Sequence, residues 1–231
     1  MHPEMGFVGD AAPDTGRREL KGWVASSRPQ PSNSRWRSSA VVGGRGGGEP
    51  PPIVGRRCDR TLGGMTIPSG PLSPADLADL FTDSPSHEPR PSDELVAEVE
   101  AELGYRLPAA FVQVSRVANG GMLRRTVITV EDGEDVAVDY LAAIGRSPED
   151  SLLGDLGTAF WIEEWGYPPV GVCVGLTVWG GHVTYWLDYT ECGSDGEPRV
   201  VEIDQELGYR TRLVAPDFVS FIRGLRVDPE G

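Results

Sequence analysis

The sequence predicts an α+β fold, in which a mainly antiparallel sheet carries an N-terminal helical hairpin and a C-terminal helix packed on it. Three observations predict this arrangement. Apolar residues recur at helical spacing over residues 92–121, they alternate with a period of two in segments of 126–204, and helical spacing returns after Pro216. The chain has 231 residues, enough for one domain of ordinary size with further sequence left over.

Capping signals define the helical hairpin. Ser92 suits the N-cap of a first helix, and Gly104 suits a left-handed residue at its end. Pro108 suits the start of a second helix, which ends at Asn119-Gly120-Gly121. The link between them is short, so we expect the two helices to pack together. Their apolar stripes are Leu95, Val96, Val99 and Leu103, followed by Phe111, Val112, Val114 and Ala118.

Alternating apolar residues predict the sheet, with strands at 126–130, 136–140, 170–178, 182–189 and 199–204. The strongest alternation is that of 170–178, which places Val170, Val172, Val174, Leu176 and Val178 on one face. Gly180-Gly181 predicts a two-residue hairpin turn to the next strand. In that strand Val183, Tyr185 and Leu187 share one face, and Thr184, Trp186 and Asp188 share the other.

The last predicted element is a helix that opens at Pro216. Its apolar residues lie at i, i+3, i+4 and i+7, which gives a stripe suited to packing on a sheet; they are Phe218, Phe221, Ile222 and Leu225.

The first 64 residues differ from the rest of the chain. They hold 12 Gly, 7 Pro and ten basic against six acidic residues, with no apolar periodicity, so we expect this basic segment to be disordered. Three interpretations stay open: a flexible basic tail, a targeting peptide, or a start site assigned too early, with Met65 as the start. We expect residues 65–91 to form a Pro-rich linker with one short helix within 73–81, and residues 92–227 to form the α+β domain.

Charge and cysteine content limit the function classes. Residues 65–231 carry 11 Arg, no Lys and 29 acidic residues, a net charge of −18. This charge suits a protein partner with a basic face rather than nucleic acid, and an acidic excess that only keeps the protein in solution explains it equally well. No stretch approaches the roughly 18 apolar residues of a membrane span, so we expect no membrane partner. The three cysteines cannot form a closed disulfide framework, and they favour a cytoplasmic location.

Signals for catalysis are weak. Neither a Gly-x-Ser-x-Gly motif nor a phosphate-binding loop occurs. A zinc site of His182, Cys173 and Cys192 is conceivable, but its spacing matches no metal motif. Glu163 and Glu164 lie among aromatic residues in 160–165, although adjacent residues on a strand point to opposite faces and would not share a substrate. We expect no catalytic residue, no metal and no cofactor.

A series of motifs in a fixed order resembles the SUKH superfamily, whose founding member is a yeast regulator of cell-wall glucan synthesis. The resemblance covers residues 92–225 and rests on the order of the blocks. These are Glu102 to Pro108 with Phe111, Asn119-Gly120-Gly121, Trp161 with Glu163, Gly180-Gly181, Tyr185 to Tyr189, Gly196 to Val201, and the helix from Ala215 to Leu225.

The resemblance implies an α+β domain without enzymatic activity. Bacterial members are mostly regarded as immunity proteins that bind and neutralise toxins, and the Gly, Arg and Ala usage is typical of bacteria with high GC content. The acidic charge suits a basic nuclease as the toxin. We expect the partner to contact Trp161, Glu163, Glu164, Trp186 and Asp188. The alternatives are a regulatory interaction module in cell-wall or signalling complexes and an acid–base or zinc enzyme centred on His182.

Overall fold

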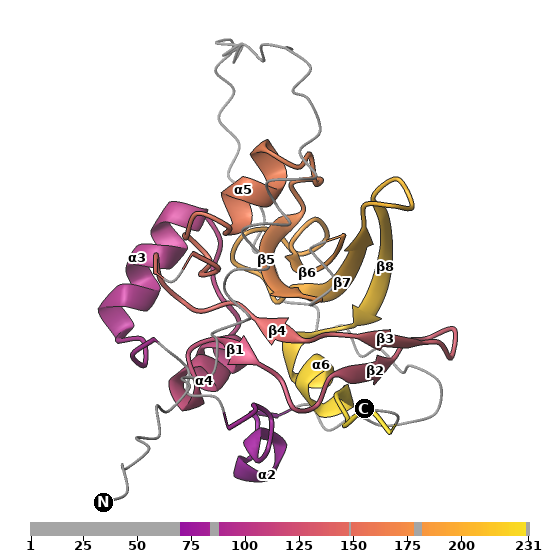
Figure 1. The fold of residues 1–231 in the computed structure, drawn as a ribbon. Helices are drawn as coiled ribbons and strands as arrows, with labels where there is room; N and C mark the ends of the chain where they lie inside the picture. Colours follow the sequence, from indigo (N-terminus) through magenta and orange to yellow (C-terminus); the bar gives the residue numbers. More distant parts are fainter. Residues whose placement is uncertain (1–69, 84–87, 148, 178–181, 230–231) are drawn as a thin grey trace, which may run out of the picture.

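A six-stranded antiparallel sheet forms the centre of the fold (Figure 1). The structure is a computed structural model, and it describes residues 70–83, 88–147, 149–177 and 182–229. The strands, in their order across the sheet, are β1 (Gly121–Met122), β4 (Tyr140–Leu141), β5 (Gly171–Leu176), β6 (Val183–Asp188), β7 (Arg199–Asp204) and β8 (Arg210–Ala215). A separate hairpin pairs β2 (Val127–Thr129) with β3 (Asp135–Ala137).

The described helices are α2 (Pro74–Leu77), α3 (Asp93–Leu103), α4 (Ala109–Val117), α5 (Thr158–Glu163) and α6 (Phe218–Gly224). Their caps explain where α3 and α6 begin and end. The Ser92 hydroxyl accepts a hydrogen bond from the Leu95 N–H at 3.2 Å, and Gly104 ends α3 with a φ of 74°. α6 is capped by Asp217, one residue after the predicted opening at Pro216. The predicted α+β class and mainly antiparallel sheet are confirmed.

The sheet separates two apolar clusters. On β6, Tyr185 and Leu187 belong to the larger cluster and Trp186 to the smaller one, as the predicted alternation requires. The larger cluster contains the whole apolar stripe of α6, and its Phe218 ring meets Phe111 of α4 at 5.2 Å between centroids. The smaller cluster lies under α5 and consists of Trp161, Trp165, Tyr167, Cys173, Trp186, Val201 and Ile203.

The alternation predicted for residues 170–178 is interrupted by a bulge. Cys173 pairs with Trp186, but Gly175 pairs with Tyr185, so Val174 is the extra residue in β5. As a result Leu176 packs on the smaller cluster, whereas Val172 and Val174 belong to the larger one. Val178 and the predicted turn at Gly180-Gly181 lie outside the described residues.

The segment 160–165, predicted to be a strand, contains most of helix α5 instead. The Glu164 N–H bonds to the Phe160 carbonyl, and the Trp161 N–H bonds to that of Gly157. Two strands, β1 and β8, have no counterpart in the sequence-based prediction, and β4 overlaps the predicted strand 136–140 only at Tyr140.

Part of the predicted linker at 65–91 packs against the domain. Leu72 and Leu80 are 4% and 1% exposed and belong to the larger cluster. The side-chain amide of Gln113 on α4 donates to the Leu72 carbonyl at 2.8 Å. The predicted helix within 73–81 is α2, whose N-cap Ser73 forms a capping box with Asp76. Residues 70–83 therefore contribute to the core.

Candidate protein-binding surface

Helix α5 is held on the sheet by its first residue. The Thr158 hydroxyl accepts a hydrogen bond from the Cys173 N–H of β5 at 3.2 Å, and Thr158 is buried. At the other end, the Tyr167 N–H bonds to the Trp161 carbonyl at 3.0 Å, which turns the chain back over the sheet after the helix. Because both ends are fixed, the side chains of α5 have a defined position.

Beneath α5 the aromatic side chains form a packed layer. Trp161 lies 5.5 Å from Trp165 and 5.8 Å from Tyr167 between ring centroids, and Tyr167 stacks on Trp186 at 5.9 Å. Each of these four rings is at most 4% exposed. Packed aromatic pairs of this kind stabilise a core beyond the area they bury, so the layer is a rigid base for whatever lies above it.

The predicted contact residues separate into two groups. Trp161 and Trp186 belong to the buried aromatic layer, and Asp188 is 2% exposed at the far end of β6. Their burial removes these three side chains from the surface that a partner meets. Glu163 and Glu164, in contrast, are exposed at the C-terminal end of α5.

Asp188 has a structural environment. Its carboxylate accepts hydrogen bonds from the Thr190 hydroxyl at 2.6 Å and from the Arg199 Nε at 2.8 Å. Burial alone would raise the pKa of Asp188, but the hydrogen bonds from Thr190 and Arg199 outweigh burial and hold that pKa below its usual value. The carboxylate therefore stays charged and fixes the start of the β6–β7 connection.

Glu163 and Glu164 lie outside the ion pairs that hold other acids of this domain. Three exposed arginines of the described residues pair with acids: Arg116 with Asp93, Arg124 with Asp83 and Arg146 with Glu102. Within the part of the chain that the structure describes, no ion pair involves Glu163 or Glu164. The two carboxylates are available to a cationic partner, and no internal bond has to break first.

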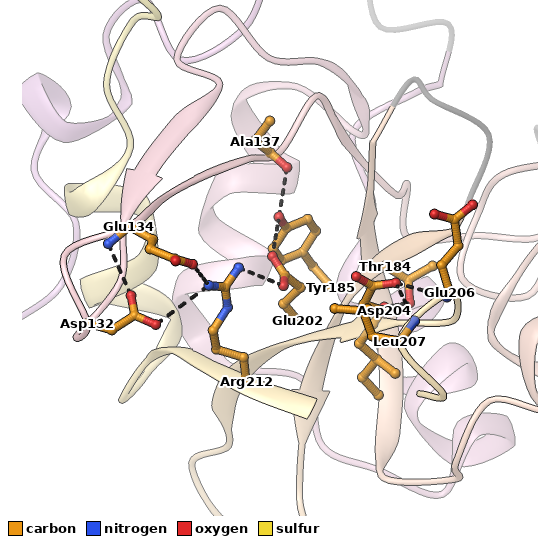
Figure 2. A network of polar contacts seen from close by, with 11 residues as sticks. Asp132, Glu134, Ala137, Thr184, Tyr185, Glu202, Asp204, Glu206, Leu207 and Arg212 are labelled. Carbon is orange, nitrogen blue, oxygen red and sulfur yellow. Dashed lines mark hydrogen bonds and ion pairs between the residues drawn. The ribbon is translucent and has the colours of Figure 1, made fainter. Parts of the chain in front are cut away.

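The β7–β8 turn adjoins this helix and was not identified from the sequence. The Tyr209 hydroxyl donates to the Trp165 carbonyl at 2.5 Å, and the two tyrosines Tyr209 and Tyr167 meet at 5.1 Å. Asp204 accepts hydrogen bonds from the backbone N–H groups of Glu206 and Leu207, as Figure 2 shows. Asp204 and Gly208 could have indicated this turn in the sequence, because Asp and Gly both favour turns.

We define the α5 surface as Glu163, Glu164, Glu206, Leu207 and Tyr209. Leu207 is 54% exposed, which makes it one of the few large apolar side chains that the described surface presents. The α5 surface thus combines three exposed acids with one exposed apolar side chain and a half-buried tyrosine, and interface patches combine an apolar contact with charged residues in the same way. The patch is suited to binding a protein with basic side chains.

A second polar network is centred on Arg212, in the middle of β8 (Figure 2). Arg212 contacts the buried Glu202 at 2.9 Å and Glu134 of the β2–β3 turn at 2.6 Å. The Tyr185 hydroxyl lies 2.7 Å from the Ala137 carbonyl and 3.2 Å from Glu202, and burial raises the pKa of Tyr185. With every charged group engaged inside the protein, this network joins the β2–β3 hairpin to the sheet.

The residues of the conceivable zinc site are in different environments. Cys173 is buried on β5, where burial raises the pKa of its thiol, while Cys192 is exposed in the loop after β6. His182 bonds through Nδ1 to Gln205 at 3.0 Å. In the described ranges, no group of three or more His, Cys, Asp or Glu side chains is arranged to hold a metal ion.

Of the helices placed in the structure, none has the length and apolar character needed to cross a membrane.

The fold and the order of its motifs define an α+β domain of the SUKH type. A sequence model of the SMI1 / KNR4 family (SUKH-1) matches residues 90–224, more than half of the chain, and the chain belongs to this family. Domains of the family are generally non-enzymatic binding modules. No curated protein and no solved structure matches the chain.

Proposed function

We propose that this protein is a cytoplasmic immunity protein that neutralises a basic bacterial toxin by binding it through the α5 surface. Family membership supports a binding role, and the net charge of −18 over residues 65–231 supports a basic partner. Inhibition is steric, because the bound domain covers the toxin's functional face. A nuclease is the class of toxin that fits best, since its nucleic-acid site is lined with cations that these acids would occupy in place of phosphate.

The observation that carries the proposal is the pair Glu163 and Glu164. They are exposed, they take part in no ion pair among the described residues, and they lie on a helix fixed to a rigid aromatic layer. A preorganised surface loses little conformational entropy on binding, so more of its interaction energy appears as affinity. Unpaired acids also raise the rate of association with a basic protein, and added salt reduces this rate enhancement.

Co-expression tests the proposal. The full chain is expressed together with the toxin-like product of a neighbouring reading frame, and growth and complex formation are measured. We expect growth to be restored and the two proteins to co-purify. The variant Glu163→Lys/Glu164→Lys should lose both effects.

A matched control keeps the same change in net charge but leaves α5 intact. Glu98 on α3 and Asp195 in the β6–β7 connection are exposed acids in no ion pair of the described region. Glu98→Lys/Asp195→Lys should still restore growth. Equal loss in both variants would indicate that only total charge matters. If no neighbouring product is toxic and the chain instead co-purifies with a cell-wall or signalling protein, the regulatory module is the better assignment.

A further inference from the structure

The β7–β8 turn carries a leucine at an exposed position. Among the described residues four large apolar side chains are exposed, and Leu207, at 54%, is the one that belongs to the α5 surface. Leu207 is the third residue of a β-turn, which the hydrogen bond from the Gly208 N–H to the Gln205 carbonyl closes. Turns favour Asp, Asn, Ser and Gly. Neither turn formation nor burial in the core therefore accounts for a leucine at this position.

Hydrogen bonds fix the backbone of this turn. The Asp204 carboxylate accepts bonds from the N–H groups of Glu206 at 2.9 Å and Leu207 at 3.2 Å (Figure 2). The Gln205 N–H bonds to the carbonyl of His182, just before β6, at 2.8 Å. Each N–H group of the turn thus has a partner, so the leucine has a defined position.

Tyr209, which follows the turn, has a backbone conformation that tyrosine does not favour. Its φ is 61°, in the left-handed region that glycine adopts without strain. The Tyr209 hydroxyl donates to the Trp165 carbonyl at 2.5 Å, and its ring meets that of Tyr167 edge-on at 5.1 Å between centroids. A glycine at this position would avoid the strain but would make neither contact. The strained tyrosine thus joins the turn to the residue that follows Glu164.

We infer that Leu207 is the apolar anchor of the α5 surface, that it enters an apolar pocket of the basic partner, and that Tyr209 positions it. This inference rests on the proposed function and specifies the contact chemistry of its partner. Glu206, whose side chain is 70% exposed, directly precedes the anchor. Glu164 directly precedes Trp165, to which Tyr209 is bonded. Because acids lie on both segments that this bond joins, cationic side chains border the partner's pocket.

The acids and the leucine contribute to binding in different ways. Unpaired acids steer a basic partner and raise the association rate, but exposed ion pairs add little to affinity and salt weakens them. Burial of an apolar side chain does not depend on charge, and it acts mainly by slowing dissociation. A leucine on a fixed turn also loses little conformational entropy when it is buried. The anchor thus supplies affinity that the acids alone do not.

Calorimetric titration of the full chain with the toxin-like neighbouring product tests the anchor. Leu207→Ala should raise the dissociation constant about tenfold, because the apolar contact is lost. This ratio to wild type should be the same at low and high salt, whereas the ratio for Glu163→Lys/Glu164→Lys should fall as salt is raised. Val117→Ala is the control. Val117 is 48% exposed but lies on α4, so its truncation should leave the affinity unchanged.

Tyr209→Phe tests the positioning role, because this variant keeps the ring and loses the hydroxyl that bonds to Trp165. It should raise the dissociation constant about fivefold in the wild-type background. In the Leu207→Ala background it should change the constant by less than about twofold, since no anchor is then left to position. Without a partner present, the amides of residues 205–208 should exchange hydrogen faster in Tyr209→Phe than in wild type.

The outcomes separate the anchor from the proposed function. Unchanged or salt-dependent affinity loss in Leu207→Ala, together with the expected loss in Glu163→Lys/Glu164→Lys, would overturn the anchor and leave the proposed function standing. Equal effects of Tyr209→Phe in both backgrounds, or unchanged hydrogen exchange, would overturn the positioning role. Absence of binding by the wild type would overturn the proposed function, and the anchor with it.

Discussion

The guanidinium of Arg212 on β8 lies 2.9 Å from the carboxylate of Glu202 on β7, and Glu202 is only 5% exposed. The same guanidinium lies 2.6 Å from Glu134 in the β2–β3 turn. One cation thus neutralises a buried acid and also holds a separate hairpin against the sheet. Without Arg212, the Glu202 carboxylate would remain buried with no opposite charge beside it.

Removal of Arg212 should therefore destabilise the fold strongly. We expect Arg212→Ala to lower the free energy of unfolding by about 3 kcal/mol, because Glu202 is left buried without its partner. Glu202→Gln should cost less, about 1 kcal/mol, since Arg212 keeps Glu134. Urea denaturation measures both. Equal losses in the two variants would contradict a dominant role for the uncompensated charge.

Asp188 should make stability depend on acid pH. The pKa of Asp188 is depressed in the folded protein, so its contribution is complete above the unfolded pKa of about 3.9 and is lost as pH falls through the lower folded value. We expect Asp188→Asn to be about 1–3 kcal/mol less stable than wild type at pH 7, because charged hydrogen bonds are lost. The difference should shrink as the pH approaches 3. A difference that stays constant would show that charge plays no part.

Leu80 tests whether residues 70–83 belong to the domain. The side chain is 1% exposed and packs in the larger cluster, although it precedes the matched family region. Leu80→Ala should lower the free energy of unfolding by about 2–5 kcal/mol through lost burial and the remaining cavity. Leu207→Ala is the control and should change it by less than about 0.5 kcal/mol, because Leu207 is exposed. An unaffected Leu80→Ala variant would mean that the segment is a true linker.

Trp161 and Glu163 should have separable roles despite lying two residues apart. Trp161→Ala should cost about 3–5 kcal/mol of stability, because the ring is buried in the aromatic layer. Glu163→Gln should leave stability within about 0.5 kcal/mol. Urea denaturation, monitored by tryptophan fluorescence, measures the stability of both variants. A stable Trp161→Ala variant that loses only partner binding would restore Trp161 to the contact surface.

Elements with strong local signals were predictable from the sequence. The cap at Ser92, the left-handed Gly104 and the apolar stripe from Phe218 to Leu225 each act within a few residues, and the structure confirms them. β6 was also predictable, because its residues alternate between two faces. In the structure these two faces pack in different apolar clusters.

Tertiary contacts decided the elements that were missed. Thr158 to Glu163 is short and rich in residues that favour strands, but its hydrogen bond to Cys173 and its aromatic packing hold it as a helix. β8 shows little alternation because it is an edge strand whose first residues face solvent. The contact residues were predicted from their residue types, as acids and aromatics of the sheet region, and residue type does not distinguish a buried Trp186 from an exposed one.

The measurement that tests the account most directly is calorimetric titration of the full chain with the toxin-like neighbouring product. Wild type and Glu98→Lys/Asp195→Lys should bind with similar affinity, and the affinity should fall as salt is raised. Glu163→Lys/Glu164→Lys should bind at least about tenfold more weakly, a loss of about 1.4 kcal/mol. Unchanged binding by this variant would contradict the assignment of the α5 surface as the contact.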